Sequence, residues 1–364
     1  MIETTAIRTI NKDPFMVIWD IGRRCNYDCS YCEATRHNNY SKHKSLDELK
    51  DTFNFVLDWT DIQNSVKKNK SLVAINFTGG EPTANPVLWE FVDYIKSREQ
   101  SISLSLTSNG AWGSKYCNNI IKNFDHITVS YHAEAHENLK KLVIENILTL
   151  KKAGISLQVN VMLHVDYWEE TVNVYNLLKD KGIKAKPRPI GDGNIVRKGW
   201  FLDTDGTMRR SSHEYTPEQQ SWFFNEMGIN NVPGSSAEGN QFGRACCGGR
   251  CLEGKVDGQW KPINFINTNF KNWHCMIDKF FLFIDQETRE VYHHQTCKAL
   301  PDKQIGSLGK LDNSKQLLAD LSDRLSKDIT IICPNDRCGC GMCIPKAQDL
   351  EDFNELKKSI LATA

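Results

Sequence analysis

Residues 21–34, IGRRCNYDCSYCEA, decide how this chain is interpreted. Cys25, Cys29 and Cys32 follow one another there in a C-x3-C-x2-C spacing. Three thiolates on one short loop can hold three corners of an iron–sulfur cubane, and a four-iron cluster normally takes four cysteines. The triplet therefore predicts a cluster with one open iron, where a substrate or cofactor can bind. The alternative is a zinc site, which needs four closed ligands and would use His37 as the fourth.

Short apolar strands alternate with amphipathic helices around this segment. Ser45 and Glu48 form the pattern of a capping box at the start of one helix, and Gly154 is expected to end another over residues 136–152. Six βα units in succession predict a parallel sheet with right-handed crossovers. Six are too few to close the standard eight-stranded barrel, so we expect an α/β fold, a partial (β/α)6 TIM-like barrel. The strands are expected at residues 16–21, 72–78, 102–107, 126–132, 155–164 and 183–190.

The alternation of side chains along these strands predicts a hollow barrel. One set of positions is apolar, as at Leu104 and Leu106, and the other is polar, as at Ser105, Ser130 and Asn160. A closed barrel normally fills its interior with branched apolar side chains. Because buried polar groups without partners cost about 1–3 kcal/mol each, we expect water or a ligand inside. The lumen is therefore predicted to be a ligand cavity, and the alternative is an open sheet with this face in water.

The composition is that of an ordinary globular protein with many thiols. The 364 residues carry 45 Lys and Arg against 45 Asp and Glu, which argues against non-specific nucleic-acid binding. There is no apolar run of about 18 residues and no secretory signal. We therefore expect no membrane span and a cytoplasmic location. In a reducing compartment, 13 cysteines favour metal binding over disulfides.

A second motif follows the second expected strand. Gly79, Gly80, Glu81 and Pro82 form a GGEP segment there. Two glycines would let the backbone approach a ligand closely, and Glu81 can help hold a cationic ammonium group. Together with the C-x3-C-x2-C loop, whose aromatic Tyr31 precedes the last cysteine, this segment resembles the radical SAM superfamily. The resemblance covers about residues 14–190.

The resemblance implies cofactors and a mechanism. S-adenosylmethionine (SAM) would chelate the open iron of a [4Fe–4S] cluster held by the three cysteines. An electron from the cluster, supplied by a flavodoxin- or ferredoxin-type donor, would break the C5′–S bond, and the 5′-deoxyadenosyl radical would take a hydrogen atom from the substrate. The site is expected at the carboxyl ends of the strands. The implied cofactor-binding residues are Tyr31, Gly79, Gly80, Glu81, Ser108, Asn109, Ser130, Asn160 and Arg188.

Two residues are candidates for catalysis, and two cations for substrate binding. His132 shares a strand face with Ser130 and is expected to reach the substrate; the alternative is a satisfied barrel histidine. Cys251 lies in GRACCGGRCLEG and could be a redox or hydrogen-donor thiol, a cluster ligand, or part of a structural loop. Lys186 and Arg188 point inward by parity and would hold a carboxylate or phosphate, unless that strand edge is solvated.

The cysteines after residue 274 resemble those of the SPASM and twitch domains, which carry auxiliary four-iron clusters in radical SAM enzymes. Two of them flank a predicted hairpin, and a C-x2-C pair follows some forty residues later. The run after residue 332 departs from the seven-cysteine SPASM pattern. One cluster, two clusters, and a zinc site or no auxiliary metal therefore all stay open. The expected ligands are Cys275, Cys297, Cys340 and Cys343, with Cys333 and Cys338 as further candidates.

The chain is expected to have four parts. These are a radical SAM partial barrel (1–190), a bridging region that selects the substrate (191–273), a cysteine-rich auxiliary-cluster domain (274–348) and a C-terminal helix (349–364). We expect an enzyme of oxidoreductase or isomerase type that oxidises, rearranges or epimerises a small-molecule or nucleoside substrate. The short segment before the barrel favours such a substrate over a leader-bearing peptide. The alternatives are a maturase that modifies a peptide side chain and a non-catalytic zinc or Fe–S redox sensor.

Overall fold

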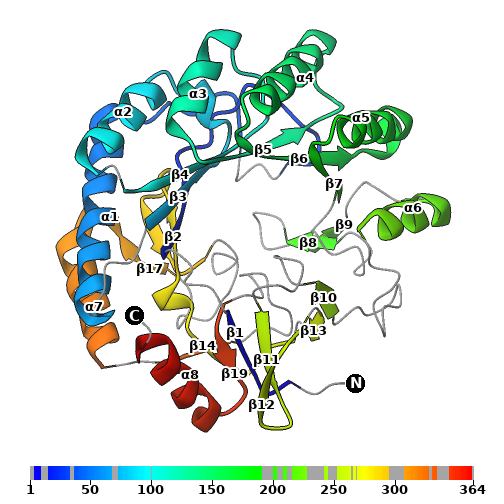
Figure 1. Ribbon diagram of the computed structural model, residues 1–364. Coiled ribbons are helices and arrows are strands. Elements are labelled where there is room, and N and C mark those ends of the chain that lie inside the picture. The colour runs from blue at the N-terminus through cyan, green and yellow to red at the C-terminus, as the bar shows by residue number, and fades with distance from the viewer. Residues whose placement is uncertain are drawn as a thin grey trace.

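The computed structural model describes residues 4–9, 15–32, 37–67, 73–99, 101–190, 200–202, 208–210, 215–227, 242–244, 252–263, 265–267, 269–294, 307–327, 330–333 and 344–362. A nine-stranded and a six-stranded sheet, with helices against them, make up most of these residues (Figure 1). Among them, no helix has both the length and the apolar character needed to cross a membrane.

The larger sheet contains the predicted βα repeat. Its order is β17-β16-β15-β2-β3-β4-β5-β6-β7, and β2 to β7 are each parallel to the next strand. In the described residues this sheet is open, with β17 and β7 at its edges. The predicted strands are confirmed to within one or two residues. They are β2 (Phe15–Asp20), β3 (Val73–Thr78), β4 (Ser103–Ser108), β5 (His126–Tyr131), β6 (Ser156–Leu163) and β7 (Lys184–Pro189).

Five helices connect these strands and cover the convex side of the curved sheet (Figure 1). The capping box at the start of the first is confirmed, since Ser45 N donates to the Glu48 carboxylate at 2.8 Å and Glu48 N donates to Ser45 Oγ at 3.3 Å. Gly154 follows the fourth with φ at +76°, a conformation that glycine adopts without strain. The helices are α1 (Leu46–Lys67), α2 (Leu88–Arg98), α3 (Cys117–Asn123), α4 (Glu137–Lys152) and α5 (Trp168–Asp180).

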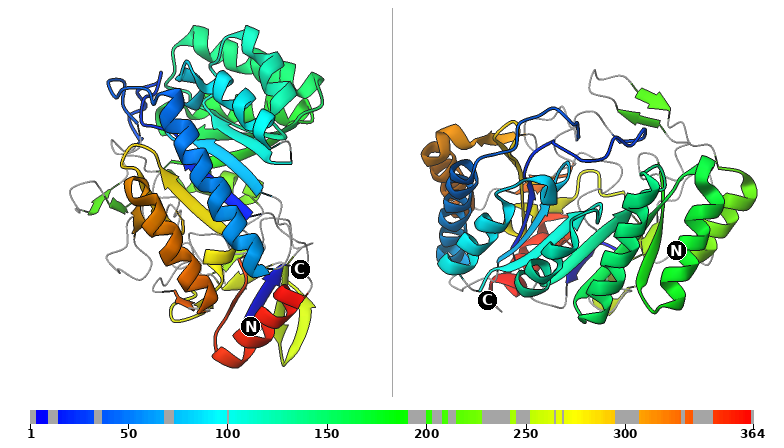
Figure 2. Two further views of the ribbon diagram at one scale, coloured as in Figure 1. Left: turned by 90° about the vertical axis from the view of Figure 1, so that its left-hand side faces the viewer. Right: turned by 90° about the horizontal axis from the view of Figure 1, so that it is seen from above.

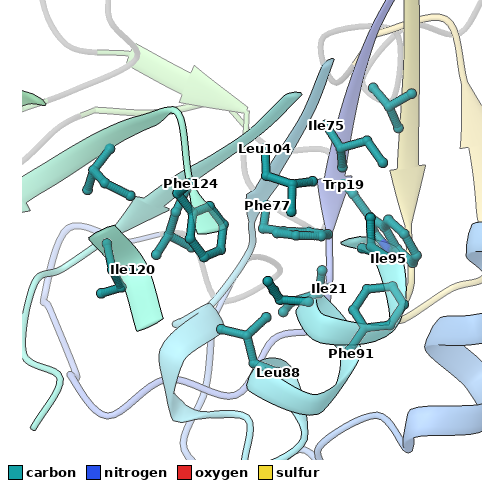
Figure 3. Close-up of a cluster of buried hydrophobic side chains, with 14 of the residues drawn as sticks. Trp19, Ile21, Ile75, Phe77, Leu88, Phe91, Ile95, Leu104, Ile120 and Phe124 are labelled. Atoms are coloured by element: carbon teal, nitrogen blue, oxygen red, sulfur yellow. The ribbon is translucent and has the colours of Figure 1, made fainter. Parts of the chain in front are cut away.

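The sheet face that meets these helices forms the main core (Figure 3). Leu104 and Leu106 of β4 are fully buried, and the ring of Trp19 packs 5.4 Å from Phe91 of α2. The alternate positions are polar and half-buried, as Ser105 on the same strand illustrates. The predicted alternation is therefore confirmed, and one face of the sheet is left polar.

The larger sheet continues with strands from far along the chain. β15 (Phe281–Asp285) pairs in parallel with β2, and β16 (Glu290–Tyr292) and β17 (Ser307–Lys310) follow antiparallel. α7 (Ser314–Ser326) packs beside α1, as Figure 2 shows. The predicted hairpin after Cys275 is thus present, and it extends the barrel sheet rather than standing apart from it.

The smaller sheet brings together strands from distant parts of the chain in the order β12-β11-β1-β19-β14-β18. The N-terminal strand β1 lies between β11 and β19. The predicted C-terminal helix, α8 (Leu350–Ala362), is held against this sheet by Asp352, which accepts hydrogen bonds from Thr5 Oγ1 at 2.6 Å and Lys255 Nζ at 2.7 Å. The strands are β1 (Ala6–Thr9), β11 (Leu252–Val256), β12 (Gln259–Pro262), β14 (His274–Cys275), β18 (Ile331–Ile332) and β19 (Lys346–Ala347).

Small elements occupy the described part of residues 191–273. The ring of Trp222 packs 5.3 Å from Tyr175 and 5.5 Å from Trp168, and Phe223 is fully buried. These two aromatic residues therefore form a local core against α5. The elements are β8 (Trp200–Leu202), β9 (Met208–Arg210), α6 (Pro217–Met227), β10 (Phe242–Arg244) and β13 (Phe265–Asn267).

Gln286 joins the added strand to the barrel, and its loss should destabilise the fold. Its Oε1 accepts a hydrogen bond from Trp19 Nε1 at 3.0 Å, and both side chains are fully buried. Gln286→Ala leaves the indole N–H without this partner, so we expect the free energy of unfolding to fall by about 1–3 kcal/mol in denaturant titrations. The exposed Gln316→Ala on α7 is the control, expected within about 0.5 kcal/mol of the parent. Equal effects of the two variants would contradict this account.

Candidate active site

The cysteine loop begins at the carboxyl end of β2 and is held by the segment that follows β3. Gly80 N donates to Gly22 O at 2.7 Å, and Glu81 N donates to Arg24 O at 2.9 Å. These two bonds join the GGEP segment to the backbone immediately before Cys25. The two motifs, more than fifty residues apart in sequence, therefore form one structural unit.

Both glycines of this segment are needed for close approach. Gly79 has φ at +120°, and a Cβ there would lie 2.4 Å from Asp20 Oδ1. A Cβ on Gly80 would lie 2.4 Å from the carbonyl oxygens of Arg23 and Arg24. The glycines were predicted to admit a ligand. In the structure they admit the backbone of the cysteine loop, and their contact with a ligand stays a prediction.

Of the three thiols of the loop, Cys29 is buried, and Cys25 and Cys32 are partly buried. Burial is the main cause that raises the pKa of Cys25 to about 11 and that of Cys29 to about 12, and in both the nearby thiol of Cys32 adds to the effect. Without a metal these two thiols are therefore protonated at neutral pH. Because iron binds thiolates, loading the site must release protons.

The donor set fits a cubane better than a single ion. Within the described ranges, no three His, Cys, Asp or Glu side chains gather closely enough to hold one metal ion. His37, the fourth zinc ligand considered above, instead lies 3.7 Å from Asp28 Oδ1. In a four-iron cluster each thiolate binds a different iron, so the thiols need not converge on one point. The three cysteines of the loop suit that arrangement.

Glu81 joins the end of β3 to the end of β4. Its carboxylate is 3% exposed and accepts hydrogen bonds from Thr83 N at 3.0 Å, Thr83 Oγ1 at 2.5 Å, Ser108 Oγ at 2.7 Å and Asn109 N at 2.7 Å. Burial raises the pKa of Glu81, and these hydrogen bonds oppose that rise. The carboxylate therefore orients Ser108 and Asn109. Its predicted contact with the ammonium group of SAM stays a prediction.

Asn109 connects Glu81 to the cysteine loop. Its Nδ2 donates to Asn26 Oδ1 at 2.7 Å and lies 4.0 Å from Cys25 Sγ. Asn26 follows Cys25 directly in the loop. Of the predicted cofactor residues, the structure thus brings Glu81, Ser108 and Asn109 together beside the first cysteine.

Tyr31 and His132 also meet at the loop. The Tyr31 hydroxyl and His132 Nδ1 are 2.5 Å apart, their rings are stacked, and His132 Nδ1 lies 3.5 Å from Cys29 Sγ. Burial lowers the pKa of His132 to about 4, so the imidazole is neutral at pH 7. His132 therefore contacts the cysteine loop, and its predicted contact with a substrate stays a prediction.

Ser130, Asn160 and Arg188 lie on the polar face in adjacent strands. Ser130 of β5 is opposite Asn160 of β6, and Asn160 is opposite Lys186 of β7. Arg188 Nε donates to Asn160 Oδ1 at 3.3 Å. These residues form a polar band that leads from the cysteine loop toward the edge strand β7.

A family comparison agrees with this geometry. Residues 19–185 match the family model described as the Radical SAM superfamily. This part of the chain is similar to the radical SAM superfamily. Its cofactors, a [4Fe–4S] cluster and SAM, are therefore the cofactors of this site, and Cys25, Cys29 and Cys32 would hold the cluster.

Curated relatives share the radical SAM part of the chain. A GTP 3′,8-cyclase of Campylobacter lari is 28% identical over 148 residues, which is 40% of this chain and 44% of that protein. A probable GTP 3′,8-cyclase of Saccharolobus islandicus is 26% identical over 190 residues, which is 48% of this chain and 57% of that protein. The chain thus spans about half the length of the curated relatives it matches.

A solved structure resembles the fold over more of the chain. SuiB of Streptococcus suis, bound to its precursor peptide SuiA, matches with a TM-score of 0.50 and 9% identity, covering 86% of this chain and 65% of SuiB. At this identity the likeness concerns the fold alone.

The predicted auxiliary ligands are only partly described. Cys275 is buried in β14, and Cys333 follows β18, which pairs with β14. Catalytic candidate Cys251 lies outside the described residues. The ligand candidates Cys297, Cys338, Cys340 and Cys343 also lie outside them.

Sequence reasoning missed three residues that contact the cysteine loop or its partners. Ser30 lies inside the C-x3-C-x2-C motif and donates from both N and Oγ to Glu134. Glu134 and His164 follow β5 and β6 closely, so they sit at the same sheet edge as the loop. That position after a strand was the available signal. The pairing itself depends on how the loop folds back over the sheet.

Gly80 offers a direct test of the contact between the motifs. In Gly80→Ala the methyl group would overlap two backbone carbonyls, so the loop must shift. We expect the affinity of the loop for the cluster to fall at least about tenfold, as it does when residues that support metal ligands are lost. The measurement is iron and sulfide per chain after anaerobic reconstitution. Gly113→Ala is the control, because its Cβ would meet only the Tyr116 ring at 3.9 Å. Full iron loading in Gly80→Ala would refute the role given to this glycine.

Proposed function

We propose that this radical SAM enzyme abstracts a hydrogen atom from an anionic small-molecule or nucleoside substrate. The observation that supports this substrate class is a line of cations on β7. Lys184, Lys186 and Arg188 occupy alternate positions on the polar face of the sheet. Burial, together with the charges of Arg188 and Lys184, lowers the pKa of Lys186. Within the part of the chain that the structure describes, none of the three forms an ion pair with a carboxylate.

An anionic group on the substrate would offset this repulsion. Like charges on one strand face destabilise the fold unless an opposite charge lies near them. Phosphate and carboxylate oxygens are suited to Arg and Lys donors. Asn160 already accepts a hydrogen bond from Arg188 and lies beside Ser130. A small molecule whose anionic group rests on β7 would therefore extend along the polar face toward the cysteine loop.

A [4Fe–4S] cluster on Cys25, Cys29 and Cys32, with SAM, would supply the radical chemistry, and the other residues of the chain would position SAM and the substrate. The backbone of the GGEP segment fixes the loop that bears the three cysteines. Asn109, Ser130 and Asn160 present polar groups that we assign to SAM. His132 offers a neutral imidazole beside them, because burial keeps its pKa low. The apolar core behind the sheet keeps the helix side of these strands dry.

The curated relatives make GTP the first substrate to examine. Both are named for a reaction of GTP, a nucleoside triphosphate, and its phosphates are anionic groups of the kind proposed here. We propose oxidation, rearrangement or epimerisation as the outcome for this chain. A maturase that modifies a peptide side chain is the alternative. A peptide without acidic groups would not form ion pairs with the cations of β7.

We also propose an auxiliary cluster of the SPASM or twitch type. Cys275 and Cys333 support it, because β14 and β18 are paired, with Cys275 opposite Ile331 and His274 opposite Ile332. Continuing this register places Cys333 two positions from Cys275 on the same face, the spacing of diagonal neighbours in a sheet. We further propose an electron donor of flavodoxin or ferredoxin type, since radical formation consumes one electron for each SAM cleaved.

A double variant separates the cluster that cleaves SAM from the proposed auxiliary cluster. We expect Cys29→Ala with Cys32→Ala to lose 5′-deoxyadenosine formation under dithionite while part of the iron stays bound. Cys117→Ala, at a buried position in the first turn of α3, is the thiol control and should keep both. The measurements are product release by chromatography and analysis of iron, sulfide and zinc. Continued release of 5′-deoxyadenosine from the double variant would refute the assignment. Zinc without sulfide in the parent would support the redox-sensor alternative.

Lys186→Gln tests the anionic subsite. Loss of one charged hydrogen-bond partner is worth about 1.5–3 kcal/mol, so we expect the KM for GTP to rise about ten- to a hundredfold. Formation of 5′-deoxyadenosine without substrate should be unchanged. Lys181→Gln, at the exposed end of α5, is the charge-matched control. If phosphorylated nucleosides, GTP included, stimulate SAM cleavage no more than neutral nucleosides or peptides do, the proposed substrate class is wrong.

A further inference from the structure

Glu134 lies against the middle of the cysteine loop. Its Oε2 accepts a hydrogen bond from Ser30 N at 3.0 Å, and its Oε1 accepts one from Ser30 Oγ at 2.6 Å. Ser30 follows Cys29 directly and precedes Cys32 by two residues. One carboxylate therefore accepts from both hydrogen-bond donors of Ser30, one of the two residues between Cys29 and Cys32.

His164 lies beside this carboxylate, at the end of β6. His164 is 4% exposed, and its Nδ1 accepts a hydrogen bond from Asp166 N at 3.2 Å. That bond assigns the ring proton to Nε2, which lies 3.2 Å from Glu134 Oε1. The His164 ring also packs 5.9 Å from the ring of Tyr31. Glu134 thus lies between the loop, to which it is hydrogen-bonded, and the end of β6.

In the described part of the chain, Glu134 has no lysine or arginine partner. Among the described residues, no Lys or Arg forms an ion pair with it, and the one basic side chain at ion-pair distance is His164. Lys140, the buried lysine of α4, pairs instead with Glu137 and Glu170. A partly buried anion therefore stands beside the loop that carries the cluster.

We propose that Glu134 is a positioning residue that fixes the turn between Cys29 and Cys32 and keeps the reduction potential of the cluster low. The proposal rests on the radical SAM function of the loop. An adjacent anion disfavours the added electron of the reduced cluster, and charge and hydrogen bonding near a cluster are known to set its potential. A strongly reducing cluster is what reductive cleavage of a sulfonium requires.

The positioning role and the charge can be separated by substitution. In Glu134→Gln the amide oxygen can accept from Ser30 N, and the amide nitrogen can donate to Ser30 Oγ, so the contact with the loop remains while the charge is lost. Glu134→Ala removes both. Glu137→Gln removes a charge three residues away on α4 and serves as the matched control.

The test is a potentiometric titration followed by EPR on the anaerobically reconstituted full chain, reading the cluster signal that changes when SAM is added. We expect a more positive midpoint potential in Glu134→Gln with iron content like the parent, and no shift in Glu137→Gln. We expect about tenfold or more weaker cluster retention against a chelator in Glu134→Ala, as for other lost supports of metal ligands.

Each contrary result has a defined meaning. A potential of Glu134→Gln equal to that of Glu137→Gln would overturn the tuning role. Cluster retention in Glu134→Ala equal to that of the parent would overturn the positioning role. A parent whose cluster does not respond to SAM would overturn the proposed function instead, which keeps the two failures distinguishable.

Discussion

The active site depends on a backbone contact between two short motifs. The GGEP segment after β3 lies directly on residues 22–24, and two hydrogen bonds join them. This approach is open only to glycine, since any Cβ on Gly79 or Gly80 would overlap atoms of the loop. Glu81, the next residue, then binds the ends of β3 and β4 together through Ser108 and Asn109. The position of Cys25 thus follows from the way successive βα units end at one edge of the sheet.

A short buried segment connects the barrel sheet to the smaller sheet. β14, which contains Cys275, belongs to the smaller sheet, and β15 begins only a few residues later in the larger one. The connection between them is buried, and Gln63 of α1 donates a hydrogen bond to Asp278 O at 2.9 Å within it. An auxiliary cluster bound at Cys275 would therefore keep a defined position relative to the barrel. Electron transfer or substrate binding between two clusters would need such a fixed relation.

Much of the site was predictable because its motifs are local. The alternation of apolar and polar residues gave the six parallel strands and their polar face, since side chains on a strand point to opposite sides in turn. Tyr31 and Asn109 were predicted as cofactor residues, and the structure places both at the cysteine loop. Glu134 was not predicted. Its partner Ser30 is about a hundred residues away, and no local pattern encodes that pairing.

The sequence by itself determined the order of the βα units, because the period of apolar residues encodes it. Its cysteine spacing and glycine pair carry the resemblance that implies the family and the cofactors. The tertiary structure decided which side chains surround the loop. It also decided that β15 joins β2 in parallel and that β1 lies between β11 and β19. These pairings join segments separated by more than two hundred residues. The backbone hydrogen bonds that form them are nearly the same for every residue type, so the sequence does not show which strand pairs with which.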